Sequence, residues 1–343
     1  MTTSEQVGPL RLVAQRIAGP GFATAAEAVR WMTAMQAQDP RGAAESVLLR
    51  AGGGDVPGAF TAGAIVKSWP MRGTLHLTAA EDLGWILGLT SARTLAASAS
   101  RRAALGLDDE IIARARDLLT GALTGGRSLS RAELMALWDE GGVSTAGQRG
   151  YHLLWHCALH TLVCFGPVRD GEQHLVLAEE WITAPRRPHR EEALGELALR
   201  YFRSHGPATA RDFARWTGLL AADCRTGIAV ARPSLLAVGI DGVEHLMDPG
   251  TPDLFAGHRK DALGVHLLPG FDEFILGYGE RGAVLDPEFA QLIVPGNNGV
   301  FRPTVIDRGR VTGVWKRGKG GGVEATPFTA FPARVTTALM RPR

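Results

Sequence analysis

Two glutamines, Gln36 and Gln38, have the type and spacing that most clearly suggest chemistry in this chain. Ala37 separates them, and Pro40 removes a backbone donor and favours extended geometry at Asp39. In extended backbone, residues two apart project to the same side, whereas in a helix they diverge. We therefore predict that the preceding amphipathic helix has ended by Gln36. Two amides aimed at one point offer donors and acceptors to a water or a sugar without adding charge.

Asp39 is the rival candidate within the same stretch. A carboxylate is a better base than an amide and a better partner for a cationic sugar. Its place before Pro40 suits a role in a turn or a helix terminus equally well. The two glutamines also have a structural alternative, in which they satisfy loose carbonyls at a helix end.

A second group of candidates lies at residues 71–77, where we predict a wing strand. Thr74 and His76 are two apart, so they face one side of a strand, and we expect Arg72 to share that side. Arg72 would contact phosphate, while Thr74 and His76 would orient a catalytic amide or a phosphate. The alternative is a wing strand with a structurally satisfied histidine.

A stripe of potential metal ligands consists of His152, His156, His160 and Cys164, at successive i+4 positions of a predicted helix. The helix rises about 6 Å over each such step, so four ligands cannot meet one ion. A two-ligand site would need further ligands that the sequence does not advertise. We predict packing rather than a metal site, with His152 able to meet a phosphate if exposed.

Asp272 and Glu273 form an acidic pair in the C-terminal part of the chain. Paired carboxylates are compatible with acid/base chemistry. We favour a structural interpretation, in which both are strand-edge charges and Asp272 forms an ion pair with Arg302. Arg302 follows an Asn-Asn-Gly sequence that is typical of a tight turn.

Three segments of the chain begin alike, with a hydroxyl residue followed three residues later by an acid, as in a capping box. A tryptophan follows seven or eight residues after each hydroxyl, on the face that a short helix buries. One helical pattern precedes each cap, and another helical run and a hairpin-like stretch follow. This order is that of a winged helix. The three sets are Thr24, Glu27 and Trp31; Ser130, Glu133 and Trp138; and Thr209, Asp212 and Trp216.

The predicted elements give an α+β fold of tandem winged-helix (helix-turn-helix) modules, followed by a small C-terminal β-barrel or sheet. The third helices are expected at 43–50, 150–164 and 222–236, and the ribbons at 66–77, 168–181 and 236–247. The last two ribbons turn at Asp170-Gly171 and Asp241-Gly242. C-terminal β segments are expected at 266–276, 291–294, 300–306, 310–315 and 325–331. The predicted domains are 1–105 (with the glutamine motif), 106–184, 185–262 (with a basic linker) and 263–343.

Composition is that of an ordinary globular chain: 343 residues, 45% hydrophobic and 21% charged. The net charge of +2 is modest, but only four of the 37 basic residues are lysine. Arginine suits phosphate recognition, although a GC-rich genome also enriches it. Two basic linkers are predicted, and they either contact phosphates or are simply solvated. Their arginines are Arg101, Arg102, Arg186 and Arg187.

The three cysteines are too few for a disulfide framework, which favours a reducing cytoplasm. The N-terminus lacks the apolar core of a signal peptide, and no apolar run approaches membrane-spanning length. We therefore expect no membrane association.

Four sequence blocks carry a resemblance to a known family: Met-Gln-Ala-Gln-Asp-Pro at 35–40, Met-Arg-Gly-Thr-Leu-His-Leu at 71–77, Leu-Pro-Gly-Phe-Asp-Glu at 268–273, and Pro-Gly-Asn-Asn-Gly-Val-Phe-Arg-Pro-Thr at 295–304. In order and type they resemble the winged-helix DNA glycosylases of the AlkZ and YcaQ superfamily. The resemblance covers nearly the whole chain. Gln36, Ala37 and Gln38 match the Gln-x-Gln signature of the AlkZ-like branch.

The resemblance implies a C-shaped molecule around DNA that excises alkylated purines, including bulky natural-product adducts and some interstrand crosslinks. It implies catalysis by Gln36 and Gln38, with Asp39, Thr74 and His76 as possible supporting residues. Expected DNA contacts come from Arg72, Arg101, Arg102, Arg186, Arg187 and Arg302. The biological role would be base-excision repair or the self-resistance of an antibiotic producer.

The expected partner is double-stranded DNA carrying alkylated purines, and we expect a monomer in the cytoplasm, associated with the nucleoid. No cofactor is expected. No lysine lies near the motif to serve as a nucleophile, so we predict a monofunctional hydrolase. The alternatives are a winged-helix transcriptional regulator, which would bind one undamaged sequence, and a protein that sequesters a toxic small molecule without DNA.

Overall fold

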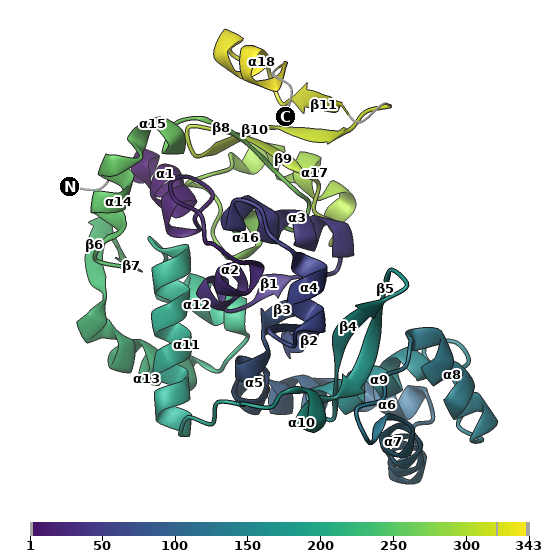
Figure 1. Cartoon of the computed structure of the whole chain (residues 1–343). Helices are drawn as coiled ribbons and strands as arrows, with labels where there is room; N and C mark the ends of the chain where they lie inside the picture. Colours follow the sequence, from purple (N-terminus) through teal and green to yellow (C-terminus); the bar gives the residue numbers. More distant parts are fainter. Residues whose placement is uncertain (1–2, 320–321, 341–343) are drawn as a thin grey trace. The chain divides into compact units, whose positions relative to one another are not determined.

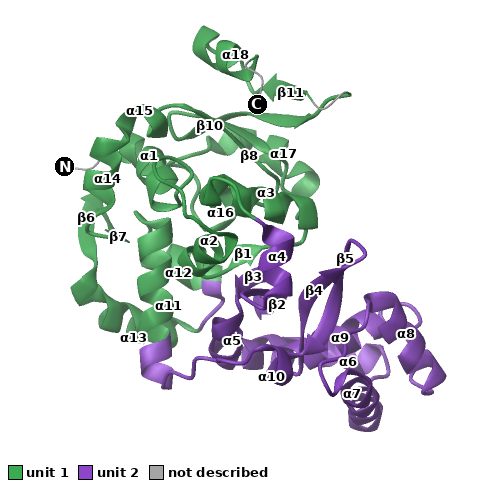
Figure 2. Ribbon diagram, in the orientation of Figure 1, with its two compact units in different colours: residues 1–54, 194–216, 220–343 green, residues 55–193, 217–219 purple. Residues whose placement is uncertain are grey.

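The computed structural model describes residues 3–319 and 322–340. The chain divides into two compact units, shown in Figure 2. Unit 1 comprises Met1–Gly54, Leu194–Trp216 and Leu220–Arg343, and unit 2 comprises Asp55–Ala193 and Thr217–Leu219. Each unit therefore joins segments that are distant in the sequence, and the elements of the first predicted module, at 1–105, are divided between the two units.

Unit 1 contains the N-terminal helices and nearly all of the C-terminal elements (Figure 1). Two buried residues of α1, Leu12 and Val13, belong to the same hydrophobic core as Phe274 and Ile306. This core ties the start of the chain to its end. The helices of unit 1, with the short strand β1, are α1 (Ser4–Ala14), α2 (Ala25–Met32), β1 (Met35–Gln36), α3 (Pro40–Ala51), most of α11 (Arg190–His205) and α12 (Ala210–Thr217), α13 (Ala221–Ala231), α14 (Thr251–Gly257), α15 (Arg259–Ala262), α16 (Glu273–Leu276), α17 (Ala290–Ile293) and α18 (Ala333–Leu339).

Two small sheets belong to unit 1. An antiparallel ribbon joins β6 (Leu236–Ile240) to β7 (Val243–Met247). The C-terminal strands form a four-stranded antiparallel sheet in the order β11-β10-β9-β8. Among the residues described, this sheet is open and does not close into a barrel. Its strands are β8 (Val265–Leu268), β9 (Thr304–Asp307), β10 (Arg310–Arg317) and β11 (Val323–Pro327).

Unit 2 is built around four strands in the order β3-β2-β4-β5. Every residue of β2 is buried, and Trp69 on this strand shares a core with Trp138 and Phe165. The strands are β2 (Ile65–Met71), β3 (Thr74–Ala79), β4 (Val163–Arg169) and β5 (Glu172–Leu177), and the helices are α4 (Val56–Thr61), α5 (Leu83–Ala97), α6 (Ala99–Ala104), α7 (Asp109–Leu123), α8 (Arg131–Glu140), α9 (Arg149–Leu159) and α10 (Ala178–Trp181).

All three predicted capping boxes form. The hydroxyl oxygens of Thr24, Ser130 and Thr209 accept the backbone N–H three residues later at 3.1, 3.2 and 3.1 Å. The acid returns the bond by accepting the backbone N–H of the hydroxyl residue, at 3.0, 2.7 and 3.0 Å. Each box opens the second of three successive helices, and a ribbon follows later in each series. The first series has two additional elements, β1 before its third helix and the short helix α4 before its ribbon.

The predicted turns at Asp170-Gly171 and Asp241-Gly242 are also confirmed, since all four residues have positive φ and join paired strands. Several boundaries differ from the predictions. The helix expected at 150–164 ends at Leu159, Thr161 turns the chain with a φ of 58°, and Cys164 lies in β4.

Two further corrections concern short segments. Residues 291–294 were expected to be β structure but lie almost wholly in the helical turn α17, because four residues are too few for periodicity to decide. The strand expected at 266–276 is confined to β8, after which the chain turns and forms α16. Phe271, with a φ of 60°, lies at this turn.

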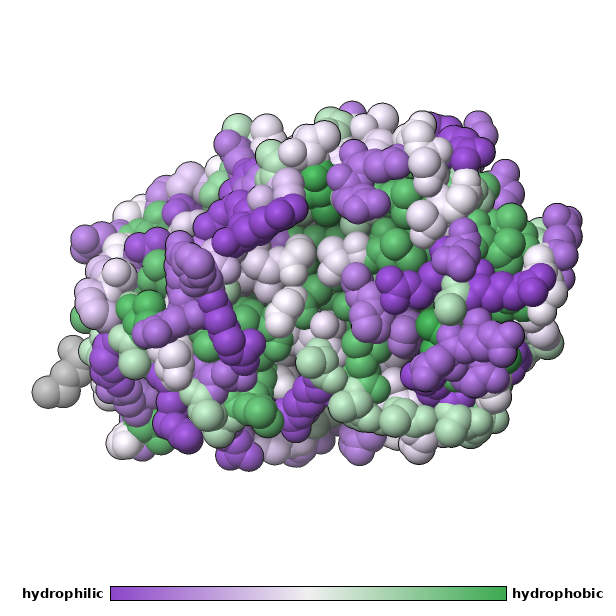
Figure 3. Space-filling view, turned by 90° about the horizontal axis from the view of Figure 1, so that it is seen from below, coloured by the Kyte–Doolittle hydropathy of each residue, from purple (hydrophilic) through white to green (hydrophobic). Residues whose placement is uncertain are grey.

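On the face shown in Figure 3, hydrophilic and hydrophobic residues are interspersed, and neither kind forms a large patch. In the described part of the chain, no helix combines the length and apolar character needed to cross a bilayer.

Candidate active site

The stretch with the two glutamines runs from β1 to the start of α3 in unit 1. Helix α2 ends at Met32, and Thr33 then turns the chain out of the helix with a φ of 68°. Gln36 is on the short strand β1, which confirms that the helix has ended before it. Ala37 is 1% exposed, whereas Gln36 is half-buried and Gln38 exposed. The motif therefore turns its apolar residue inward and keeps amide groups near the surface.

Asp39 caps the next helix. Its Oδ1 accepts the backbone N–H of Arg41 at 3.1 Å, and Pro40 occupies the first turn of α3, where its missing N–H costs nothing. A side-chain carbon added at Gly42 would lie 2.7 Å from Asp39 Oδ2 and 3.0 Å from the Gly270 carbonyl oxygen. The start of α3 thus packs tightly against the segment that precedes Asp272.

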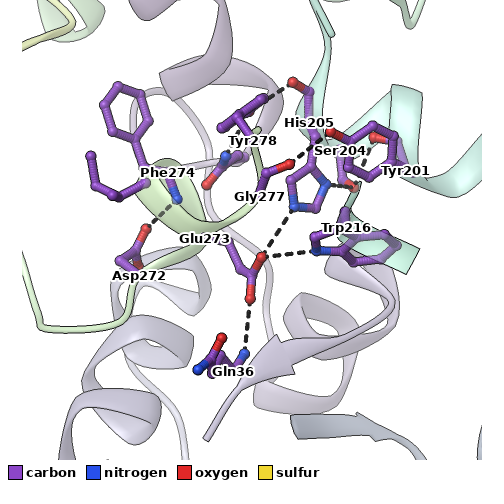
Figure 4. Close-up of polar contacts among 12 residues, drawn as sticks. Gln36, Tyr201, Ser204, His205, Trp216, Asp272, Glu273, Phe274, Gly277 and Tyr278 are labelled. Atoms are coloured by element: carbon purple, nitrogen blue, oxygen red, sulfur yellow. Dashed lines mark hydrogen bonds and ion pairs between the residues drawn. The ribbon is translucent and has the colours of Figure 1, made fainter. Parts of the chain in front are cut away.

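Glu273 holds the backbone of the first glutamine, Gln36 (Figure 4). Its Oε1 accepts the backbone N–H of Gln36 at 2.9 Å, and its Oε2 accepts the indole N–H of Trp216 at 3.1 Å. His205 Nε2 lies 3.6 Å from the same Oε2. Glu273 is 1% exposed, so this carboxylate is a buried acceptor. The prediction of a strand-edge surface charge is wrong for Glu273.

Asp272 anchors the helix on the other side of the motif. It forms a bidentate ion pair with Arg50 of α3, at 2.8 Å from Oδ2 to Nη1 and 3.0 Å from Oδ1 to Nη2. Ser46, one turn earlier on α3, donates its hydroxyl to Oδ2 at 2.5 Å. The predicted pair between Asp272 and Arg302 is wrong, because Asp272 is 2% exposed and Arg302 lies on the surface, 3.4 Å from the Leu292 carbonyl oxygen.

A chain of buried hydrogen bonds connects these two anchors. Arg50 Nη2 donates to Gln15 Oε1 at 2.6 Å, and Gln15 Nε2 donates to the Tyr278 hydroxyl at 2.9 Å. Tyr278 in turn donates to the His205 carbonyl oxygen at 2.7 Å. The ring of the same histidine lies 3.6 Å from Glu273 Oε2, so His205 links this chain of hydrogen bonds to the second carboxylate.

Burial controls the charges in this network. Complete burial lowers the pKa of His205 below its usual value, although the Glu273 carboxylate opposes the shift. Burial likewise raises the pKa of Tyr278 well above its usual range. At neutral pH both side chains are therefore neutral, and the Arg11 guanidinium stacks 3.5 Å above the Tyr278 ring. The side chains of the Arg50–Asp272 ion pair are enclosed in the same network, with 0% and 1% exposure.

The candidates of the first wing lie in unit 2. Thr74 begins β3, and Arg72 and Gly73, with φ of 53° and 69°, form the two-residue turn before it. The prediction that Arg72 shares a strand face with Thr74 is therefore wrong. His76 is wholly buried, and its Nδ1 lies 2.8 Å from the Thr74 carbonyl oxygen, which can only accept. His76 Nδ1 therefore carries the proton of this hydrogen bond.

The predicted DNA-contacting arginines differ in how far their charge is available. Arg186 donates to Asp82 at 3.0 Å, and Arg102 pairs with Asp109. Arg101 is exposed and donates to the Gln148 side chain at 2.5 Å. Arg187 and Arg302 are exposed. Exposed side chains such as these are the better candidates for phosphate contacts.

His152 and His156 lie buried on α9, and His160 caps its end. Burial, with smaller contributions from His160 and Arg102, lowers the pKa of His156 to about 4. No group of three potential metal-ligating side chains occurs among the residues that the structure describes. The packing interpretation accords with the burial of His152, His156 and Cys164, whereas His160 is exposed.

Comparison with known proteins agrees with this fold. The family model for DNA glycosylases of the AlkZ-like type matches residues 29–341. The chain belongs to this family, as predicted, and is an enzyme of the DNA glycosylase class.

A sequence comparison and a structure comparison both lead to a DNA glycosylase of Streptomyces sahachiroi. The interstrand DNA cross-link repair glycosylase of Streptomyces sahachiroi is 27% identical over 263 residues, which are 74% of this chain and 70% of the relative. The solved structure of Streptomyces sahachiroi DNA glycosylase AlkZ matches 98% of this chain and 95% of its own, with a TM-score of 0.81 and 24% identity. The second comparison establishes the fold.

Sequence reasoning missed most of the buried support. Arg50, Gln15 and His205 were not singled out, and Trp216 was noted only for its place in the repeat. The one available signal was the pairing of Asp272 with Glu273 in a block that, like the glutamine motif, carries the family resemblance.

Proposed function

We propose that this DNA glycosylase hydrolyses the N-glycosidic bond of purines alkylated at N7 or N3 in double-stranded DNA, with Gln36 and Gln38 as its catalytic side chains. The observation that carries the proposal is the setting of the motif. Both amides lie on non-helical backbone near the surface, and buried carboxylates hold the strand that carries Gln36 and the helix that follows Gln38.

Amides suffice for this reaction because of where its charge develops. Glycosidic cleavage proceeds through an oxocarbenium-like sugar, so the enzyme must stabilise a cation and orient a water. Alkylation at N7 or N3 already places positive charge on the purine, which then leaves without a strong general acid. Gln38, the exposed amide, would orient the water, and Gln36 would bond the water or sugar from the other side.

The product would be an abasic site with an intact DNA strand. A Schiff-base lyase needs an amine nucleophile, and residues 29–50 contain no lysine. We therefore propose a monofunctional enzyme without a metal or cofactor. Thr74 and His76 would support the wing near DNA, and exposed arginines would contact phosphates.

The substrate range extends, in this proposal, to bulky N7 adducts and interstrand crosslinks. The relative from Streptomyces sahachiroi is named for interstrand crosslink repair, and this chain aligns with most of it. A crosslink between two purines consists of two such adducts, so hydrolysis at either base would unhook it. The role would be base-excision repair or protection of a producer of DNA-alkylating compounds.

The test is single-turnover release of N7-methylguanine, and of a bulky N7-alkylguanine, from duplex DNA. We expect release by the wild type and a loss of at least about 100-fold in the double variant Gln36→Ala/Gln38→Ala, by analogy with removal of oriented polar contacts. Circular dichroism and melting would show that the variant is folded. No release from either duplex, with tight binding to one undamaged sequence, would contradict the proposal and support a regulator.

A further inference from the structure

The tryptophans of the three repeats occupy equivalent positions, but their indole N–H groups have different partners. Trp31 donates to the Ala14 carbonyl oxygen at 2.8 Å, and Trp138 donates to the Ala115 carbonyl oxygen at 2.9 Å. In both cases the partner belongs to the first helix of the same repeat. The first two tryptophans thus fasten one helix of their own module to another.

Trp216 departs from this pattern. Its N–H donates to Glu273 Oε2 rather than to a helix carbonyl. It is 1% exposed and packs against Tyr201 and His205, with ring centroids 4.9 and 5.1 Å away. The third repeat therefore directs its tryptophan donor to the carboxylate that binds the strand of the first repeat.

The carboxylate of Glu273 is well suited to fix a neighbour. A carboxylate only accepts hydrogen bonds, and each of its two oxygens here receives a different donor, Gln36 on Oε1 and Trp216 on Oε2. His205 faces the second oxygen and is itself held through Ser204, whose Oγ lies 2.8 Å from His205 Nδ1. Glu273 is consequently locked in one orientation.

We propose that Glu273 is a positioning residue for catalysis, and that Trp216 holds it in place. By accepting the Gln36 N–H, Glu273 fixes the peptide from which the Gln36 side chain projects, and so sets where that amide meets the sugar or water. This inference rests on the proposed function of Gln36. Because Glu273 is 1% exposed, it would act through the backbone of Gln36 and not by contact with the substrate.

The sharpest variant is Glu273→Gln, which keeps the shape of the side chain. An amide presents one acceptor oxygen and one NH₂ donor, so one of the two N–H groups would face a donor and lose its bond. Trp216→Phe is milder, since it retains a ring and removes the N–H. Trp138→Phe is the matched control, because it deletes the same kind of buried bond in unit 2.

The experiment measures single-turnover release of N7-methylguanine, the dissociation constant for the same duplex and the melting temperature. It also follows the NMR resonance of the Gln36 backbone amide. Displacement of a catalytic group by a fraction of an ångström lowers rates steeply. We expect a rate loss of about 10- to 100-fold for Glu273→Gln and about 3- to 10-fold for Trp216→Phe. Duplex affinity should stay within about twofold, since both residues are buried at 1% exposure, and the Gln36 resonance should shift in both variants.

If Glu273 and Trp216 only stabilised the fold, the release rates would follow a different pattern. Trp138→Phe should lower the melting temperature without changing the release rate, so equal rate losses in all three variants would overturn the inference. If the wild type is active and folded Glu273→Gln releases base at the same rate, the positioning role of Glu273 is refuted and the proposed function is not. Absence of release by the wild type would refute the proposed function as well, which keeps the two failures distinguishable.

Discussion

Arg50 and Asp272 form a bidentate ion pair in which neither side chain is exposed to solvent, at 0% and 1% respectively. The pair joins α3, the helix that follows the glutamine motif, to a segment 222 residues later. Removing either partner leaves a buried charge uncompensated, which is far more costly than the loss of a surface pair.

We expect Arg50→Met to lower the free energy of unfolding by about 3 to 5 kcal/mol. Chemical denaturation followed by circular dichroism measures the change. Arg232 and Glu244 offer an exposed control pair, with side chains 49% and 53% accessible. Arg232→Ala should cost less than about 1 kcal/mol. Similar losses in the two variants would contradict the importance of the buried pair.

Asp39 provides a test of the two-amide chemistry. Because its carboxylate caps α3, and asparagine is an equally good cap, Asp39→Asn should leave both stability and the single-turnover rate nearly unchanged. Asp39→Ala should cost about 0.5 to 2 kcal/mol of stability. A large rate loss in stable Asp39→Asn would instead assign the carboxylate a chemical role.

Asp55 is the matched control for this cap. Its side chain accepts the Gly58 N–H at 2.8 Å at the start of α4. Asp55→Ala should lower stability as Asp39→Ala does, and it should leave base release unaffected.

Acidification should destabilise the protein through His156. Burial lowers its pKa to about 4, whereas in the unfolded chain the pKa is about 6.5. The unfolded state therefore binds the proton first as pH falls. This contribution to stability is intact above pH 6.5 and is lost progressively between about 6.5 and 4.

The variant His156→Gln removes this titration. It should reduce by about one the number of protons taken up on unfolding in that pH range, measured from melting curves between pH 4 and 7. His189→Gln, at an exposed position, serves as the control and should leave the slope as it is in the wild type. An unaltered slope in His156→Gln would show that this histidine does not contribute.

Two adjacent arginines of the linker should behave differently towards DNA. Arg187 is exposed, whereas Arg186 donates to buried Asp82, which also accepts the Trp85 indole N–H. If the linker contacts phosphates, Arg187→Ala should reduce the magnitude of the slope of log affinity against log salt by about 1. Arg186→Ala should mainly lower the melting temperature. Fluorescence anisotropy over a salt series would test this, and equal slopes for wild type and Arg187→Ala would exclude a contact there.

Local features of the fold were predictable from sequence because their partners are close along the chain. The capping boxes at Thr24, Ser130 and Thr209 depend on residues three positions apart, and the turn at Asp241-Gly242 depends on two. Where chain direction depends on tertiary pairing, prediction was poorer. The end of α9 and the start of β4 are an example, since β4 is defined by its pairing with β5.

Of the candidate site, only the two glutamines near the surface could be predicted from the sequence; the buried residues that hold them could not. Gln36 and Gln38 stand out as a motif, but their support depends on contacts across 222 and 237 residues. Nothing in the local pattern around Asp272 and Glu273 distinguishes a buried anchor from a surface charge. Only the folded chain shows that these adjacent carboxylates point to different partners, one on α3 and the other on β1.

The distance in sequence between Gln36 and Glu273 also has a consequence during synthesis. The N-terminal helices leave the ribosome long before residues 272 and 273 are translated, so the bonds that hold Gln36 and Arg50 cannot form on a partly made chain. A truncated product that ends before residue 272 lacks both anchors. The order of translation thus delays completion of the site until most of the enzyme exists.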